Sequence, residues 1–164
     1  MCKRVGITLI ELAVTLAIVA ILAVMVLPNL GTWIQHYRIK GAVRQIVSQM
    51  ELAKIKALKY NREYRLRINT NSGTFQLEQG NRPDMSSNWG GEEPELTLPK
   101  HVSFDTVTFP QTELGQDHDR AVQFNPHGTS GHGRVVLATT RDEKYTITVR
   151  NPTGKITTYK GEIE

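Results

Sequence analysis

The chain has 164 residues, a formal net charge of +4 and one cysteine, Cys2. About 130 residues follow the apolar N-terminal stretch, which is the size of one domain, so a multidomain architecture is excluded. The small positive charge does not by itself indicate nucleic-acid binding, and a single cysteine excludes a disulfide within the chain.

The first predicted element is an apolar stretch over residues 7–30. Between Leu12 and Leu27, Thr15 is the only polar residue. A helix over residues 7–30 rises about 36 Å at ~1.5 Å per residue, which is enough to cross the hydrocarbon core of a bilayer. The stretch is too long for the apolar part of a secretory signal peptide. The sequence therefore predicts a membrane-spanning helix, which Pro28 kinks or loosens.

Charged residues predict how this helix is oriented. Lys3 and Arg4 precede it, and the next basic residue is Arg38. The positive-inside rule therefore predicts a single-pass protein with its N-terminus in the cytoplasm. Glu11 is the one charge within the first turns of the apolar stretch, where a carboxylate is costly unless it has a partner. The simpler alternative is that Glu11 is hydrated at the level of the lipid headgroups.

The residues around Glu11 form a specific motif. Gly6-Ile-Thr-Leu-Ile-Glu11 follows a short basic leader, and it resembles the processing site of the type IV pilin superfamily. The resemblance implies that a prepilin peptidase cuts after Gly6 and methylates the new N-terminus, Ile7. In this superfamily the residue after the glycine is often Phe, so Ile7 is a minor departure.

Cleavage would give Ile7 a positive amine one helical turn from Glu11. Opposite unit charges roughly 4 Å apart attract by about 4 kcal/mol at an effective dielectric constant near 20, whereas a buried unpaired charge costs several kcal/mol. We therefore hypothesise that Glu11 pairs with the Ile7 amine of an adjacent subunit and so sets the register of a filament.

The helical pattern continues over residues 31–60. Gly41 lowers the stability of this helix by about 1 kcal/mol relative to Ala. An apolar stripe predicts an amphipathic helix that packs on the domain that follows. The members of the stripe recur at steps of four and three: Ile39, Val43, Ile46, Met50, Ala53, Ala57 and Tyr60.

From residue 62 the apolar period changes to two, which predicts strands. Residues 79–99 are predicted as a loop, either a solvated connection or a partner-contact loop anchored by Trp89. Strands after one long helix predict an α+β fold, with an antiparallel sheet packed on the helix in a pilin-like arrangement. The first strand is half-buried, with Tyr64, Leu66 and Ile68 facing the core and Glu63, Arg65 and Arg67 on the other face. The second strand starts at Phe75. The later strands lie over residues 102–109 (with a bulge or break), 122–124, 135–138, 145–149 and 155–159.

Three further stretches carry a more specific resemblance. They are Leu52-Ala-Lys-Ile-Lys-Ala-Leu58, Val122-Gln-Phe-Asn-Pro-His-Gly128 and Thr153-Gly-Lys-Ile156. With them, nearly the whole chain resembles the GspH/FimT minor pseudopilins. The resemblance implies four segments: a leader over residues 1–6, a transmembrane and filament-core helix over 7–30, an amphipathic helix over 31–60, and a β-rich periplasmic domain over 61–164.

The same resemblance implies a structural role. The chain is expected to be a minor pseudopilin at or near the tip of the type II secretion pseudopilus, which supports export of folded proteins through the outer membrane. Its expected partners are other pseudopilins or pilins, the prepilin peptidase and the inner-membrane assembly platform. It is expected in the bacterial inner membrane and in a periplasmic filament.

A FimT-like minor type IV pilin, active in pilus assembly or DNA uptake, is the alternative. Such proteins are described as binding DNA through a C-terminal Gly-Arg-x-Arg motif, which here reads Gly154-Lys-Ile-Thr157. Lys155 keeps one positive charge, and Arg150 and Lys160 add charge nearby, so these residues can make at most weak contacts with phosphates. A solvated strand end is the favoured alternative. The incomplete motif favours the pseudopilin.

Two polar stretches contain groups that bind metals or phosphates in other proteins. Asp117-His-Asp119 offers too few oxygen ligands for calcium, and residues 127–134 lack the lysine and the strand-to-helix context of a phosphate loop. No Ser/His/Asp or Cys/His set stands out either. The sequence therefore predicts no metal site, no cofactor and no enzymatic activity.

Overall fold

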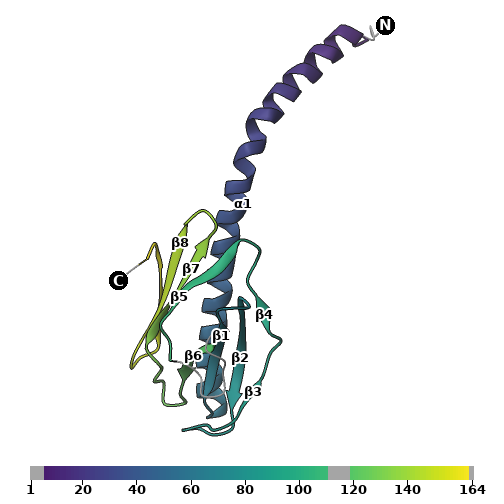
Figure 1. Ribbon diagram of the computed structural model, residues 1–164. Helices are drawn as coiled ribbons and strands as arrows, with labels where there is room; N and C mark the ends of the chain where they lie inside the picture. Colours follow the sequence, from purple (N-terminus) through teal and green to yellow (C-terminus); the bar gives the residue numbers. More distant parts are fainter. Residues whose placement is uncertain (1–5, 111–118, 163–164) are drawn as a thin grey trace. The chain divides into compact units, whose positions relative to one another are not determined.

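The computed structural model describes residues 6–110 and 119–162, and for residues 25–30 and 32 it describes the backbone alone. It consists of one long helix and two antiparallel sheets (Figure 1), which confirms the predicted α+β class. The elements are α1 (Leu9–Tyr60), β1 (Tyr64–Asn69), β2 (Thr74–Gly80), β3 (Trp89–Gly91), β4 (Leu96–Thr97), β5 (Val102–Val107), β6 (Asp119–Phe124), β7 (Gly133–Thr139), β8 (Lys144–Arg150) and β9 (Lys155–Lys160).

The chain divides into two compact units, Met1–Ile34 and Gln35–Glu164. In the first unit every described side chain is exposed. Within the described residues, no helix is long and apolar enough to cross a membrane. The span over residues 7–30 therefore stays a prediction. The kink at Pro28 also stays a prediction, because that side chain lies outside the described residues.

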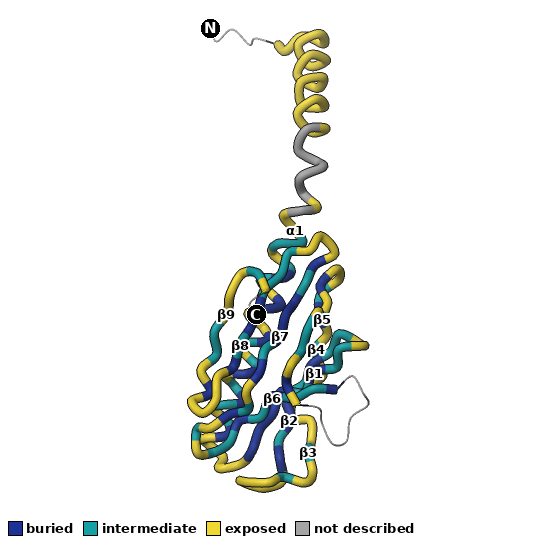
Figure 2. The backbone as a smooth tube through the Cα atoms, turned by 60° about the vertical axis from the view of Figure 1, so that its left-hand side comes forward, coloured by how far each residue is buried: buried dark blue, intermediate teal, exposed yellow. Residues whose placement is uncertain are grey.

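The second unit has a core to which the helix and both sheets contribute (Figure 2). The predicted helical stripe is buried there except at its last member, Tyr60, which is 50% exposed. The centre of the Tyr60 ring instead lies 5.0 Å from the Lys59 Nζ. The helix contributes Ile39, Ala42, Val43, Ile46, Met50, Ala53 and Ala57 to the core.

The first sheet has the order β3-β2-β1-β6, and β4 also pairs with β2. The prediction of a loop over residues 79–99 is therefore wrong in part, because β3 and β4 lie within it. Both strands are short and add to β2, whose Leu77 carbonyl also accepts a hydrogen bond from the Glu92 N–H at 2.9 Å. Runs this short leave no periodic signal in the sequence.

The prediction that β1 is covered on one face only is also wrong. Glu63 and Arg65, on the face expected to be solvated, are 1% and 9% exposed. The connection after β2 folds over them. The Glu63 carboxylate accepts hydrogen bonds from the Met85 N–H (3.1 Å), the Ser86 N–H (2.7 Å) and the Gln123 side-chain amide (2.7 Å). A buried carboxylate with three donors is stable, and it fixes that connection on the sheet.

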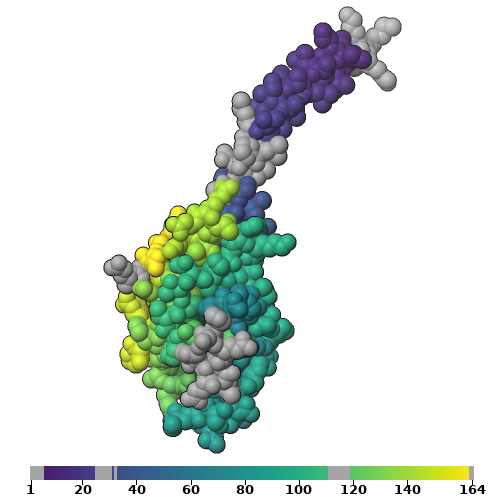
Figure 3. Space-filling model, viewed as in Figure 1, coloured from purple at the N-terminus to yellow at the C-terminus, as the bar shows by residue number. Residues whose placement is uncertain are grey.

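The second sheet has the order β5-β7-β8-β9. The register of β5 on β7 shifts between Phe104 and Thr106, which confirms the predicted bulge. Strand β9 pairs only with β8 and lies at an edge. In Figure 3 the yellow atoms of β9 lie along the left-hand side of this unit.

Candidate assembly and interaction sites

The predicted processing site lies just ahead of helix α1. Gly6, Ile7 and Thr8 have no helical conformation, and all three are exposed. The Ile7 side chain is 78% exposed. Because helical backbone groups are engaged in hydrogen bonds with one another, a peptide bond before the first turn is the more accessible substrate for a peptidase. Cleavage after Gly6 and methylation of Ile7 stay predictions.

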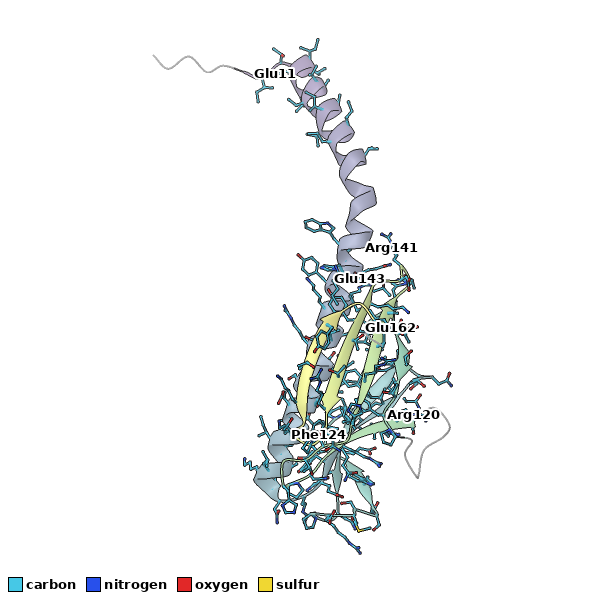
Figure 4. All side chains as sticks on the ribbon, turned by 90° about the vertical axis from the view of Figure 1, so that its left-hand side faces the viewer. Glu11, Arg120, Phe124, Arg141, Glu143 and Glu162 are labelled. Carbon is cyan, nitrogen blue, oxygen red and sulfur yellow. The ribbon has the colours of Figure 1, made fainter. Side chains whose placement is uncertain are left out.

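Thr8 caps the start of helix α1, whose first turn contains Glu11 (labelled in Figure 4). The Thr8 hydroxyl accepts a hydrogen bond from the Glu11 N–H at 3.3 Å, and the Thr8 carbonyl accepts one from the Leu12 N–H at 3.2 Å. A threonine hydroxyl in this position satisfies one of the free N–H groups of a helix start. Glu11 lies in the first turn, where a negative side chain interacts favourably with the helix dipole.

The local role of Thr8 and Glu11 could have been found from the sequence. Thr8 and Glu11 are three residues apart at the start of an apolar run, which is the signature of a capping box. The cap uses the Glu11 backbone amide. Within residues 6–110 and 119–162 the Glu11 carboxylate has no ion-pair partner, so it is available to a group from another molecule.

The three candidate DNA-contact residues do not form one cluster. Arg150 and Lys155 face each other across β8 and β9, and both are exposed. Lys160 lies at the other end of β9, where its Nζ is 3.9 Å from a Glu143 oxygen. At ~3.3 Å per residue, the five positions between Lys155 and Lys160 span about 16 Å. The structure therefore brings two of the three candidates together.

Trp89, the candidate partner anchor, is held on the first sheet. The Arg65 guanidinium lies 4.2 Å from the centre of the Trp89 ring, and the Arg65 Nε donates to Glu78 at 2.6 Å. A cation over an aromatic face is attracted by its quadrupole, so Arg65 fixes the ring in place. Trp89 also borders a hollow of about 370 Å³ next to Arg62 and Glu92.

The residues weighed for metal binding are dispersed. Asp117 and His118 lie outside the described residues, and the Asp119 carboxylate accepts a hydrogen bond from the Asn69 amide at 2.8 Å. His127 and His132 are both exposed. Among the described residues, no three potential metal ligands come together.

A pilin-like subunit is the class of protein that this geometry defines: a capped N-terminal helix behind a Gly-Ile-Thr-Leu-Ile-Glu motif, followed by antiparallel sheets on that helix. Residues 42–154 match the family described as Type II transport protein GspH, and residues 2–27 match the prokaryotic N-terminal methylation motif. The chain belongs to the GspH family, and it is a minor pseudopilin of the type II secretion system.

Two solved structures of the minor pseudopilin EpsH from the type 2 secretion system of Vibrio cholerae have the same fold. One is 13% identical, with a TM-score of 0.56 over 74% of this chain and 95% of that chain. The other is 13% identical, with a TM-score of 0.57 over 80% of this chain and 99% of that chain. No curated protein sequence matches the chain at a significant level.

Membership of this family bears on how the chain assembles and where it is located. It implies assembly with other pseudopilins in a filament. Together with the methylation motif, it indicates a periplasmic filament that is anchored in the inner membrane.

Proposed function

We propose that this chain is a structural subunit at or near the tip of the secretion pseudopilus, where it supports export of folded proteins through the outer membrane without catalysing a reaction. One observation carries the proposal. An exposed Gly6-Ile7 bond precedes a capped helix whose Glu11 carboxylate has no ion-pair partner in the described part of the chain. A carboxylate among apolar residues indicates a partner supplied from outside the subunit.

The proposed sequence of events starts in the inner membrane. The prepilin peptidase cuts after Gly6 and methylates Ile7, and the assembly platform then takes up the subunit. Residues 7–30 hold it there as a single span, with the N-terminus in the cytoplasm and the β-rich part in the periplasm. In the filament, Glu11 pairs with the Ile7 amine of a neighbouring subunit.

The exposed apolar side chains of the first unit support this sequence of events. Leu9, Ile10 and Val24 are 87%, 72% and 70% exposed. A continuous apolar surface of this kind is not stable in water and indicates burial in lipid or against other protein helices. In the proposal these side chains are buried in lipid before assembly and against other protein helices after it.

The test is the amount of folded exoprotein that reaches the culture medium. Deletion of the gene is expected to abolish secretion, and the wild-type gene is expected to restore it. A Glu11→Ala gene is expected not to restore it. Glu51→Ala removes an exposed carboxylate elsewhere on α1 and is the matched control. Undiminished secretion in the deletion strain would overturn the proposal.

The second candidate function is a DNA-capturing minor pilin. Arg150 and Lys155 lie opposite each other at the turn end of the β8–β9 hairpin, and this is the observation that favours it, because two adjacent cations can contact phosphates. Against it, Lys160 lies near Glu143 rather than near this pair. A tight and salt-sensitive mobility shift of duplex DNA by the full chain would favour this function over the first.

A further inference from the structure

The second sheet carries a group of cations on its outer face. Arg134 on β7 is opposite Thr148 on β8, and Arg150 on β8 is opposite Lys155 on β9. Directly opposite residues in an antiparallel pair share a face. Val149, next to Arg150, is buried in the core, so the face that holds Arg150 is the outer one. Figure 4 views the molecule from the side of β8 and β9.

This face has a hollow lined in part by Arg134 and Arg150, with a volume of about 370 Å³. No carboxylate is among its lining residues within the described part of the chain. Its walls are rich in hydrogen-bond donors, and the Tyr159 ring adds an apolar side. The principal lining residues are Thr108, His132, Arg134, Thr148, Arg150 and Tyr159.

The outer-face cations elsewhere on these sheets already have partners. Lys144, at the other end of β8, lies 3.1 Å from Asp105 and 3.0 Å from Glu162. Arg150 and Lys155, by contrast, form no ion pair with any described residue. The first sheet shows the same neutralisation: Arg65 and Arg67 both pair with Glu78, and Arg67 also pairs with Asp119.

We infer that this hollow binds carboxylate side chains from an acidic segment of a neighbouring protein in the pseudopilus. Arginine holds a carboxylate through two parallel N–H···O bonds, and the threonine hydroxyls can add further donors. The inference rests on the proposed function for the source of the partner. It adds to that function a site and the chemistry of the ligand.

Charge placement favours an acidic protein segment over a nucleic acid. A nucleic-acid strand carries a phosphate at every nucleotide and needs cations along its whole path. On this face Arg134, Arg150 and Lys155 lie toward one end, and at the other end Lys144 is held between Asp105 and Glu162. A strand of phosphates along the face would meet these two carboxylates, whereas one or two acidic side chains fill the hollow alone.

The test uses the full chain in a neutral detergent at low salt, with a fluorescein-labelled hexaglutamate peptide as the probe. Fluorescence polarisation is expected to show binding that weakens about tenfold in Arg150→Gln, because one charge-assisted contact is lost. Arg150 is exposed, so the variant is expected to fold, and its thermal unfolding is recorded alongside. Arg82→Gln removes the same charge from the connection after β2 and is expected to leave binding unchanged.

Three results would overturn the inference: no binding of hexaglutamate, equal binding by wild type and Arg150→Gln, or equal losses in both variants. A fourth result, tighter binding of a single-stranded oligothymidylate with the same dependence on Arg150, would assign the hollow to nucleic acid instead. The proposed function is tested separately, by secretion in the deletion strain. If secretion depends on the gene and hexaglutamate does not bind, only this inference fails.

Discussion

The two units of the chain differ in the exposure of their apolar side chains. In Met1–Ile34 the described large apolar side chains of helix α1 are exposed, from Leu9 at 87% to Ile34 at 49%. In Gln35–Glu164 the same helix buries Ile39 and Ile46 completely against the sheets. One helix therefore contains a segment that is stable only with material from outside the chain and a segment that the chain completes by itself.

This difference assigns the two segments different tasks. Burial of apolar surface stabilises by roughly 25 cal/mol per Å², and in the first unit that stabilisation can come only from lipid or from other subunits. In the proposed function, the first unit is accordingly the element of anchoring and assembly. The second unit is proposed to be the scaffold whose sheets contact partners.

The largest expected effect comes from blocking processing of the first unit. Gly6→Val places a branched side chain at the cleavage site, so the leader is expected to remain and secretion of exoprotein to be lost completely. Immunoblots for the longer precursor measure this. Gly41→Ala is the matched control, because Gly41 lies in helix α1 and an added Cβ meets nothing within 4 Å. This control is expected to be processed normally and to gain about 1 kcal/mol of helix stability.

The next effect separates the two roles of the first helical turn. Glu11→Gln removes the charge of the side chain. The hydrogen bond from the backbone N–H of residue 11 to the Thr8 hydroxyl remains. It is expected to abolish co-purification with other pseudopilins. Thr8→Ala keeps the carboxylate and removes the cap, at a cost of about 1 kcal/mol in helix stability. It is expected to assemble almost normally. If Thr8→Ala lost assembly as fully as Glu11→Gln, capping rather than charge pairing would explain the motif.

A smaller effect, confined to the second unit, concerns its core. Leu66 on β1 is fully buried, so Leu66→Ala is expected to lower the free energy of unfolding by about 2–5 kcal/mol. Leu58→Ala, at a position 53% exposed on α1, is expected to change it by less than about 0.5 kcal/mol. Urea unfolding followed by circular dichroism measures both. Equal losses would show that the exposed face of the helix also packs within the subunit.

The smallest effect is a pH dependence of the second unit. Burial, with a hydrogen bond to Glu92, raises the pKa of Tyr64 to about 12. The folded state therefore keeps the proton that the unfolded chain loses near pH 10. The stabilisation is complete below pH 10 and disappears as the pH rises towards 12, by up to about 3 kcal/mol.

Variants isolate the contribution of Tyr64 to this alkaline loss. Tyr64→Phe is expected to lose less stability between pH 10 and pH 12 than wild type, as measured by urea unfolding at each pH. Tyr159→Phe removes an exposed hydroxyl and is expected to follow the wild-type curve. A Tyr64→Phe curve parallel to wild type would contradict the assignment.

Features with a local signal could be predicted from the sequence. The stripe from Ile39 to Ala57 identified the buried face of the helix, because helical period is set by neighbouring residues alone. The change of period after residue 62 located β1 for the same reason. The N-terminal motif pointed to the family because its residues are consecutive.

Features that depend on distant contacts could not be predicted. The burial of Glu63 results from hydrogen bonds to Met85, Ser86 and Gln123, which lie more than 20 positions away in the chain. Arg134 and Arg150 line one hollow because β7 and β8 pair in a particular register. Register is fixed by the assembled sheet, so the spacing of the two residues in the sequence carries no sign of it.

The first unit is proposed to be processed for assembly into a filament. The most direct measurement is mass spectrometry of the N-terminal peptide of the chain, isolated from cells that have a prepilin peptidase. The expected result is a peptide that begins at Ile7 with a methylated amine. A peptide that still begins at Met1 would rule out this processing, since Ile7 could then offer no amine to Glu11 of a neighbouring subunit.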